Sequence, residues 1–249
     1  MSVDKSPWPS PMLRRVLLSC GIVSTLLYLS TDIIAGTMWK GYSFTNQAVS
    51  ELSAVGAPTR EFVVPLYFLY SVLMIAFGLG VWGYSRKRFL RITAGLMVGI
   101  GLLGFVGYPF PLRLGVAEAE FTNTIHTIIA SVTGRSYMAA MGFGAFAYGR
   151  RFRLYSIGTL LVLIVVGALA AFMAGTDITQ RGFTAPPPWF GLIERIDIYS
   201  SMIWVAVLAS VLLRVERLDM QTSSTKRVDN SSGGPEETHS SKSPIYLIN

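Results

Sequence analysis

Six runs of about 20 mostly apolar residues dominate this sequence, and each is long enough for an α-helix to cross the hydrocarbon core of a bilayer. Charged residues make up only 14% of the chain and hydrophobic residues 51%, whereas a soluble domain carries about 25% charged residues. The sequence therefore predicts an all-α polytopic membrane protein, a six-transmembrane-helix bundle with spans at about 13–35, 62–84, 92–110, 124–148, 155–174 and 196–213.

Basic residues are distributed unevenly between the two sides of the predicted membrane. Most of the 21 Lys and Arg residues lie in the N-terminal segment, in the loops after the second and fourth spans, and after the sixth span. The positive-inside rule places these segments in the cytoplasm, so we predict cytoplasmic termini in the plasma membrane of the cell. The net charge of +7 then reflects topology. It predicts no binding of nucleic acid, because no basic and aromatic motif accompanies it.

The spans divide the chain into three parts. Residues 1–12 form a cytoplasmic N-terminal segment, and residues 13–213 form the membrane domain. The end of the chain is rich in Ser, Thr, Gly and charged residues, a composition that cannot bury a core. Residues 214–249 are therefore predicted to be a disordered cytoplasmic tail.

The scarcity of cysteine and histidine excludes several kinds of site. The single cysteine, Cys20, lies in the first span, which excludes a disulfide framework and a thiolate metal site. The two histidines, His126 and His239, are too few for a zinc site with three imidazoles or for haem held by histidine pairs. The sequence predicts neither a cofactor nor a metal ion.

The connection between the first two spans has a helical pattern of its own. Residues 45–55 show helical spacing, Gly56 suits the left-handed conformation that ends a helix, and Pro58 prevents its continuation. At about 100° per residue, one side of this segment is formed by Gln47, Ser50, Glu51 and Ala54. We predict a short amphipathic helix in the first outer loop, whose polar stripe faces either bulk water or a central cavity.

The same loop contains a characteristic series of small and polar residues, which is Gly41-Tyr42-Ser43, Gln47, Ser50-Glu51-Leu52-Ser53-Ala54 and Gly56-Ala57-Pro58. This series resembles the signature of a bacterial membrane-protein family catalogued as domain of unknown function 998. The span count, the position of His126 and the segment from Trp189 to Arg195 are also similar to that family. The resemblance covers roughly residues 12–215. It implies a six-helix integral membrane protein and no known reaction.

Ionisable side chains gather where the predicted spans meet the outer surface. Asp32 lies near the outer end of the first span, Glu51 on the loop helix and His126 at the start of the fourth span. Carboxylates and an imidazole at one level suit acid–base chemistry, so these three are the candidate catalytic residues. Acids at a helix start also complement the helix dipole without any ligand. The candidate ligand-binding residues at this level are Gln47, Ser50, Arg60, Glu194 and Asp197.

Two charged residues lie inside predicted spans, where an unpaired charge is costly. Asp32 is near the C-terminal end of its helix, where the dipole disfavours a negative charge, so it needs a partner such as Arg60, Arg195 or His126. Arg135 lies at mid-depth in the fourth span, with no acid at its level. It binds either backbone carbonyls and water or an anionic ligand, and it is therefore a further ligand-binding candidate.

Three functions agree with these features. The first is a pocket at the outer face for a lipid-like or small amphipathic ligand, with acid–base chemistry on that ligand as an option. The second is a membrane scaffold or assembly factor without chemistry, and the third is a transporter subunit with Arg135 in an anion path. Enzyme and non-enzyme alternatives both stay open at this point. The expected partners are the lipid bilayer and the lipid-like ligand.

Overall fold

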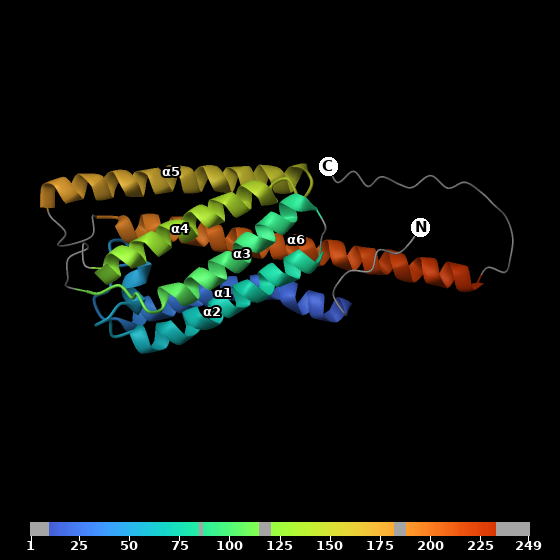
Figure 1. Ribbon diagram of the computed structural model, residues 1–249, viewed down its shortest axis with the longest axis horizontal. Coiled ribbons are helices and arrows are strands. Elements are labelled where there is room, and N and C mark those ends of the chain that lie inside the picture. Colours follow the sequence, from blue (N-terminus) through green and yellow to red (C-terminus); the bar gives the residue numbers. More distant parts are fainter. Residues whose placement is uncertain (1–9, 85–86, 115–120, 182–187, 233–249) are drawn as a thin grey trace.

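The computed structural model describes residues 10–84, 87–114, 121–181 and 188–232 of the chain. One short 3-10 helix, η1, and six long α-helices account for the secondary structure of these residues, with no named strand among them: α1 (Pro11–Met38), η1 (Val49–Ser53), α2 (Arg60–Tyr84), α3 (Arg88–Gly107), α4 (Phe121–Gly144), α5 (Arg150–Arg181) and α6 (Phe190–Ser232). The α-helices run lengthwise beside one another (Figure 1). The all-α prediction is confirmed for this part of the chain.

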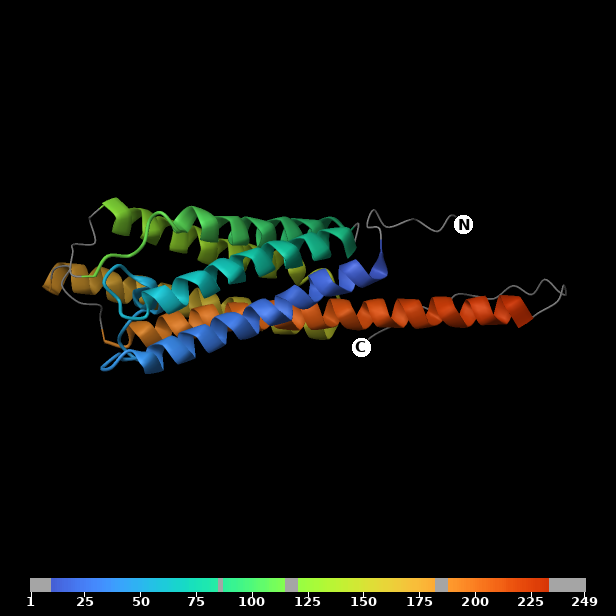
Figure 2. The same ribbon diagram turned by 90° about the horizontal axis from the view of Figure 1, so that it is seen from below.

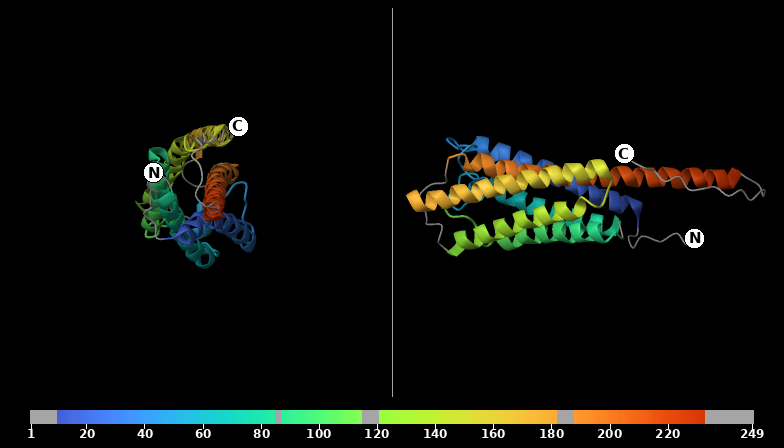
Figure 3. Two further views of the ribbon diagram at one scale, coloured as in Figure 1. Left: turned by 90° about the vertical axis from the view of Figure 1, so that its right-hand side faces the viewer. Right: turned by 90° about the horizontal axis from the view of Figure 1, so that it is seen from above.

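The α-helices form a ring. Each one packs against the next along the chain, and the contact of α1 with α6 closes the arrangement. Figure 2 shows α1 beside α6, and the end-on view in Figure 3 shows the helices grouped around a common axis. Residues from opposite ends of the sequence therefore meet along the α1–α6 contact.

Five of the described helices are long and apolar enough to cross a membrane, which are α1, α2, α3, α5 over Arg150–Ala170 and α6 over Phe190–Leu218. A multi-pass membrane protein follows from this result. The exception is α4, whose sequence includes the polar residues Asn123, His126 and Arg135. Its neighbours α3 and α5 hold it in the ring, while its crossing of the membrane stays a prediction.

Several helix ends differ from the predicted span boundaries. The fourth helix begins at Phe121, and the fifth extends from Arg150 to Arg181. Residues 214–232 continue α6 in place of the predicted disordered tail, and residues 233–249 lie outside the described residues. A formed helix grows by one hydrogen bond for each added residue, and the next helix-breaking residues in the sequence are Gly233-Gly234-Pro235.

One cluster of buried apolar side chains fills the ring. Trp204 of α6 is fully buried in it and lies 6.1 Å, between ring centroids, from Phe152 of α5. Its indole nitrogen donates to the hydroxyl of Ser156 at 2.9 Å. On α4 a Cβ at Gly144 would lie 2.8 Å from the indole ring, so glycine is needed there. Three helices thus meet around one aromatic side chain.

Two ion pairs tie α1 to α6 at opposite ends of the bundle. Arg14 Nε lies 2.7 Å from Glu216 Oε1, and Arg195 Nε lies 3.0 Å from Asp32 Oδ2. The α1 segment between Arg14 and Asp32 is about 27 Å long at 1.5 Å per residue. The hydrocarbon core of a bilayer is about 30 Å thick, so the two pairs flank the apolar layer.

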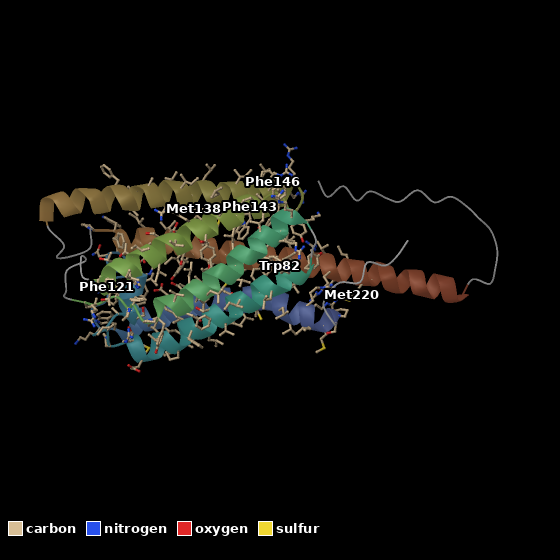
Figure 4. All side chains as sticks on the ribbon, viewed as in Figure 1. Trp82, Phe121, Met138, Phe143, Phe146 and Met220 are labelled. Carbon is tan, nitrogen blue, oxygen red and sulfur yellow. The ribbon has the colours of Figure 1, made fainter. Side chains whose placement is uncertain are left out.

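Basic side chains lie over aromatic rings at the end that contains the Arg14–Glu216 pair. The guanidinium of Arg91 is 4.7 Å from the ring centroid of Trp82, and that of Arg153 is 5.5 Å from Phe146. Figure 4 shows Trp82 and Phe146 toward this end and Phe121 at the opposite one. Such pairs are typical of a membrane–water interface. We call this end the basic end. The opposite one, with η1, is called the outer end after the orientation predicted from the sequence.

Candidate functional site

The polar centre of the outer end is an ion pair between α1 and α6. Asp32 has no exposed surface and Arg195 is 5% exposed. The Nε and Nη2 atoms of Arg195 donate to Oδ2 and Oδ1 of Asp32, both at 3.0 Å, which is the strong bidentate geometry of this pair. Tyr199, one turn further along α6, donates its hydroxyl to Oδ2. Of the three cations considered for Asp32, its partner is therefore Arg195.

The other donors of Arg195 hold the first outer loop. Nη1 donates to the carbonyl oxygens of Phe44, Gln47 and Gly191 at 2.8, 3.0 and 3.1 Å. Nη2 also donates to the hydroxyl of Tyr42 at 2.7 Å. The guanidinium carbon lies 4.9 Å from the ring centroid of Phe44 and 5.5 Å from that of Tyr42. We name this set the Arg195 clamp, which consists of Asp32, Tyr42, Phe44, Arg195 and Tyr199.

The loop also covers the start of α6. The backbone N–H of Leu192 donates to the carbonyl of Thr45 at 3.0 Å, and that of Trp189 donates to Oδ1 of Asn46 at 3.1 Å. A Cβ at Gly191 would lie 2.1 Å from the carbonyl oxygen of Gln47, so the two backbones touch. The loop therefore satisfies N–H groups that the first turn of a helix leaves without partners.

The helix in this loop is shorter than the one predicted for residues 45–55. It is the 3-10 helix Val49–Ser53, preceded by Ala48 in an extended conformation. In an α-helix the carbonyl of Gln47 would accept from the N–H of Glu51, but here it accepts from Arg195. The extended Ala48 interrupts the predicted helix, and the N–H of Glu51 donates instead to the carbonyl of Ala48 at 3.2 Å. Val49 and Leu52, which lie outside the predicted polar stripe, are buried.

Two carboxylates bind the start of η1. Glu51 accepts from the N–H of Ala48 and from Nε2 of Gln47, both at 2.9 Å. Glu194 accepts from the next N–H, that of Val49, at 2.6 Å. Both glutamates are half-buried, and neither forms an ion pair with a Lys or Arg among the described residues. The outer end therefore holds two adjacent carboxylates that form no ion pair among the described residues.

The predicted acid–base set of Asp32, Glu51 and His126 is not assembled. The Nδ1 atom of His126 lies 3.3 Å from the carbonyl oxygen of Phe110, which places it between the end of α3 and the start of α4. In the described part of the chain it contacts neither carboxylate. Periodicity places His126 at the right depth, but α4 packs mainly against α3 and α5, and it meets Trp204 of α6 at Gly144, toward the other end of the helix.

The remaining candidate residues lie next to the Arg195 clamp and η1, or away from them. Arg60 donates to the carbonyl of Ser53 and so holds the end of η1. Ser50, within η1, is half-buried. Asp197 is half-buried on α6, about 200° around the helix from Arg195, and thus faces away from the clamp. Arg135 is exposed on α4.

Two clamp residues, Phe44 and Tyr199, have no part in the sequence-based predictions, and Tyr42 appears there only in the family signature. Tyr199 follows Arg195 by four residues, and residues at this spacing share one face of a helix. That spacing is a usable signal in the sequence. No comparable signal points to Phe44, because it meets Arg195 only through the tertiary fold.

Burial raises the pKa of Tyr42, which lies in the outer loop, to about 12, although the hydrogen bond from Arg195 lowers it. The unfolded chain has a tyrosine pKa of about 10. Stabilisation by the protonated hydroxyl is therefore complete below about pH 10 and is lost as the pH rises from about 10 to 12. Unfolding at several alkaline pH values should show a shallower decline for Tyr42→Phe than for wild type. Tyr108→Phe, at an exposed tyrosine, should keep the wild-type slope, and equal slopes in all three proteins would refute this assignment.

Comparison with known protein families identifies the family of this chain. The model of the family described as "Protein of unknown function (DUF998)" matches residues 22–211, well over half of the chain. The chain belongs to this family. The matched residues include the Arg195 clamp, Glu51 and Glu194, so all of these residues lie within the family domain. No curated protein and no solved structure matches the chain.

Proposed function

We propose that this member of the DUF998 family binds the polar head group of a lipid-like or small amphipathic ligand at its outer end, through Glu51 and Glu194. One observation carries the proposal. Two half-buried carboxylates accept from successive backbone N–H groups and form no ion pair among the described residues. The carboxyl oxygens accept hydrogen bonds, so a ligand with donors such as hydroxyl or ammonium groups would complement them.

The Arg195 clamp supports this proposal because it fixes the loop that carries Glu51. A group held in place before binding loses less conformational entropy when the ligand arrives. Asp32 accepts three hydrogen bonds from Arg195 and Tyr199, so it positions the loop and has no role in reaction chemistry. With His126 bonded elsewhere, we propose ligand binding and not acid–base catalysis.

We also propose that the basic end faces the cytoplasm and that the protein lies in the plasma membrane, which places Glu51 and Glu194 at the outer leaflet. The concentration of arginines over aromatic rings at the basic end supports this orientation, since cytoplasmic segments carry the excess of Lys and Arg.

The double substitution Glu51→Gln/Glu194→Gln should release the ligand. Wild-type protein extracted gently from its native membrane should carry a lipid-like adduct in native mass spectra. Hydrogen bonds to a charged group contribute about 1.5–3 kcal/mol each, so we expect the double variant to retain at least about tenfold less adduct. Glu61→Gln, at an exposed acid in the first turn of α2, is the matched control and should retain it. Equal adduct in all three proteins would contradict the assignment of these carboxylates.

A membrane scaffold is the second candidate function. The observation that favours it is that the donor nitrogens of Arg195 all bond within the chain, as expected of a structural anchor. Wild-type protein without any adduct would rule out the ligand proposal and favour the scaffold. The transporter hypothesis receives no support, because Arg135 is exposed on α4 while Tyr137, Ala140 and Met141 of that helix face the interior.

A further inference from the structure

Two cavities adjoin at the basic end, between α1 and α6, on the opposite side of the apolar layer from Glu51 and Glu194. Their volumes are about 480 and 340 Å³, within the range of about 300–1,000 Å³ that is common for ligand sites. Arg217 lines both of them. We name the pair the basic groove, which is lined by Arg15, Arg217, Met220 and Gln221 in the larger cavity and by Ile22, Ser210, Leu213, Arg214 and Arg217 in the smaller one.

The charge of the basic groove is positive. Among the side chains that the structure describes, three arginines and no acid line it. The nearby acid, Glu216, is 1% exposed and is paired with Arg14 at 2.7 Å. An anion can therefore approach the groove without meeting an uncompensated carboxylate on its walls.

One arginine that lines the groove has a buried donor without an acceptor. The Nε atom of Arg15 is buried and has no hydrogen-bond partner within the described residues. A buried donor without a partner in a native protein calls for an explanation. Guanidinium groups match the oxygens of phosphate in geometry and charge, so a phosphate held at Arg15 would bring an acceptor to this side chain.

The groove also has an apolar wall. Ile22 and Leu213 line it next to the arginines, and Ile22 is about 10 Å further along α1 than Arg15 at 1.5 Å per residue. Figure 4 shows Met220 where α6 leaves the bundle, near the start of α1. The groove thus leads from arginines at the membrane surface to apolar side chains at hydrocarbon depth.

We infer that the basic groove binds the phosphate group of an anionic membrane lipid in the leaflet at the basic end. Arg15 and Arg217 hold the phosphate, Arg214 adds positive charge, and Ile22 and Leu213 lie along the acyl chain. Basic pockets between membrane helices are a known way to bind anionic head groups. This site is separate from the proposed outer site and does not depend on it.

The test uses full-length protein in nanodiscs of phosphatidylcholine with a minor fraction of phosphatidylglycerol. Native mass spectrometry should find phosphatidylglycerol enriched on the wild type. Each arginine near a membrane surface contributes about 1 kcal/mol to attraction of anionic lipid, or about fivefold in binding. The double substitution Arg15→Gln/Arg217→Gln should therefore lower the enrichment by more than tenfold. Arg217→Lys, which keeps the charge, should retain most of it.

Two controls make the test decisive. Arg151→Gln removes an exposed arginine at the same end, outside the groove, and should leave the enrichment unchanged. An equal loss in Arg151→Gln and in Arg15→Gln/Arg217→Gln, in variants that still elute as folded protein, would overturn the site. In nanodiscs of phosphatidylcholine alone, inorganic phosphate should bind weakly. Tight binding of inorganic phosphate without lipid enrichment would overturn the lipid assignment.

Discussion

Replacing Arg195 with methionine should lower the free energy of unfolding by about 3–5 kcal/mol, because it leaves the buried carboxylate of Asp32 without its charge partner. Asp32 is fully buried, and its bonds to Arg195 are both 3.0 Å long. The same substitution removes the donors to the carbonyls of Phe44 and Gln47. Titration with SDS in mixed micelles, followed by circular dichroism, measures the change.

A second substitution separates the charge effect from the loss of loop contacts. In Asp32→Asn/Arg195→Met the uncompensated charge is gone, so the double variant should recover a large part of the stability lost in Arg195→Met. Arg151→Met, at an exposed position, should change the free energy by no more than about 0.5 kcal/mol. If Arg195→Met unfolds like the Arg151 variant, the clamp does not stabilise the protein.

Gly191→Ala should also be strongly destabilising, by about 2–3 kcal/mol, which is the upper part of the range for overpacking. The added Cβ would lie 2.1 Å from the carbonyl oxygen of Gln47 and 2.9 Å from that of Phe44. Both atoms are backbone, so the whole loop must shift. These carbonyls are also acceptors of Arg195, and a shift would break the clamp. The same SDS titration gives the free energy of unfolding.

The matched control is Gly99→Ala in α3, where a Cβ meets nothing within 4 Å. Alanine is favoured over glycine in a helix interior by about 1 kcal/mol, so this variant should be as stable as wild type or slightly more so. Equal stability of the two alanine variants would mean that the loop does not rest on α6 at Gly191.

The positions of the helices follow from the apolar runs, because the thickness of the bilayer fixes the length of each span. The span predicted at 62–84 corresponds to α2 at Arg60–Tyr84, and that at 92–110 to α3 at Arg88–Gly107. Helix ends outside the apolar layer are less predictable. Glu216 lies in the predicted tail, yet it bonds to Arg14, 202 positions earlier in the chain. No local pattern in the sequence predicts such a contact.

The candidate site is predictable in part. A carboxylate such as Asp32 inside an apolar helix requires a cationic partner, whatever the fold. The choice among Arg60, Arg195 and His126 depends on which helices become neighbours, and the ring places α6 beside α1. Arg60 bonds instead to the loop, and His126 to the end of α3. The hydrogen bond from the N–H of Val49 to Glu194 likewise depends on the loop folding onto α6.

Carboxyl labelling tests most directly whether a ligand covers Glu51 and Glu194. Delipidated protein is treated with a water-soluble carbodiimide and an amine, with and without added native lipid extract, and labelled sites are identified by mass spectrometry. Both glutamates are half-buried and Glu61 is exposed, which makes Glu61 the internal control. We predict that the extract protects Glu51 and Glu194 and leaves Glu61 equally labelled. Equal labelling of Glu51 and Glu194 with and without the extract would contradict a ligand site at the outer end.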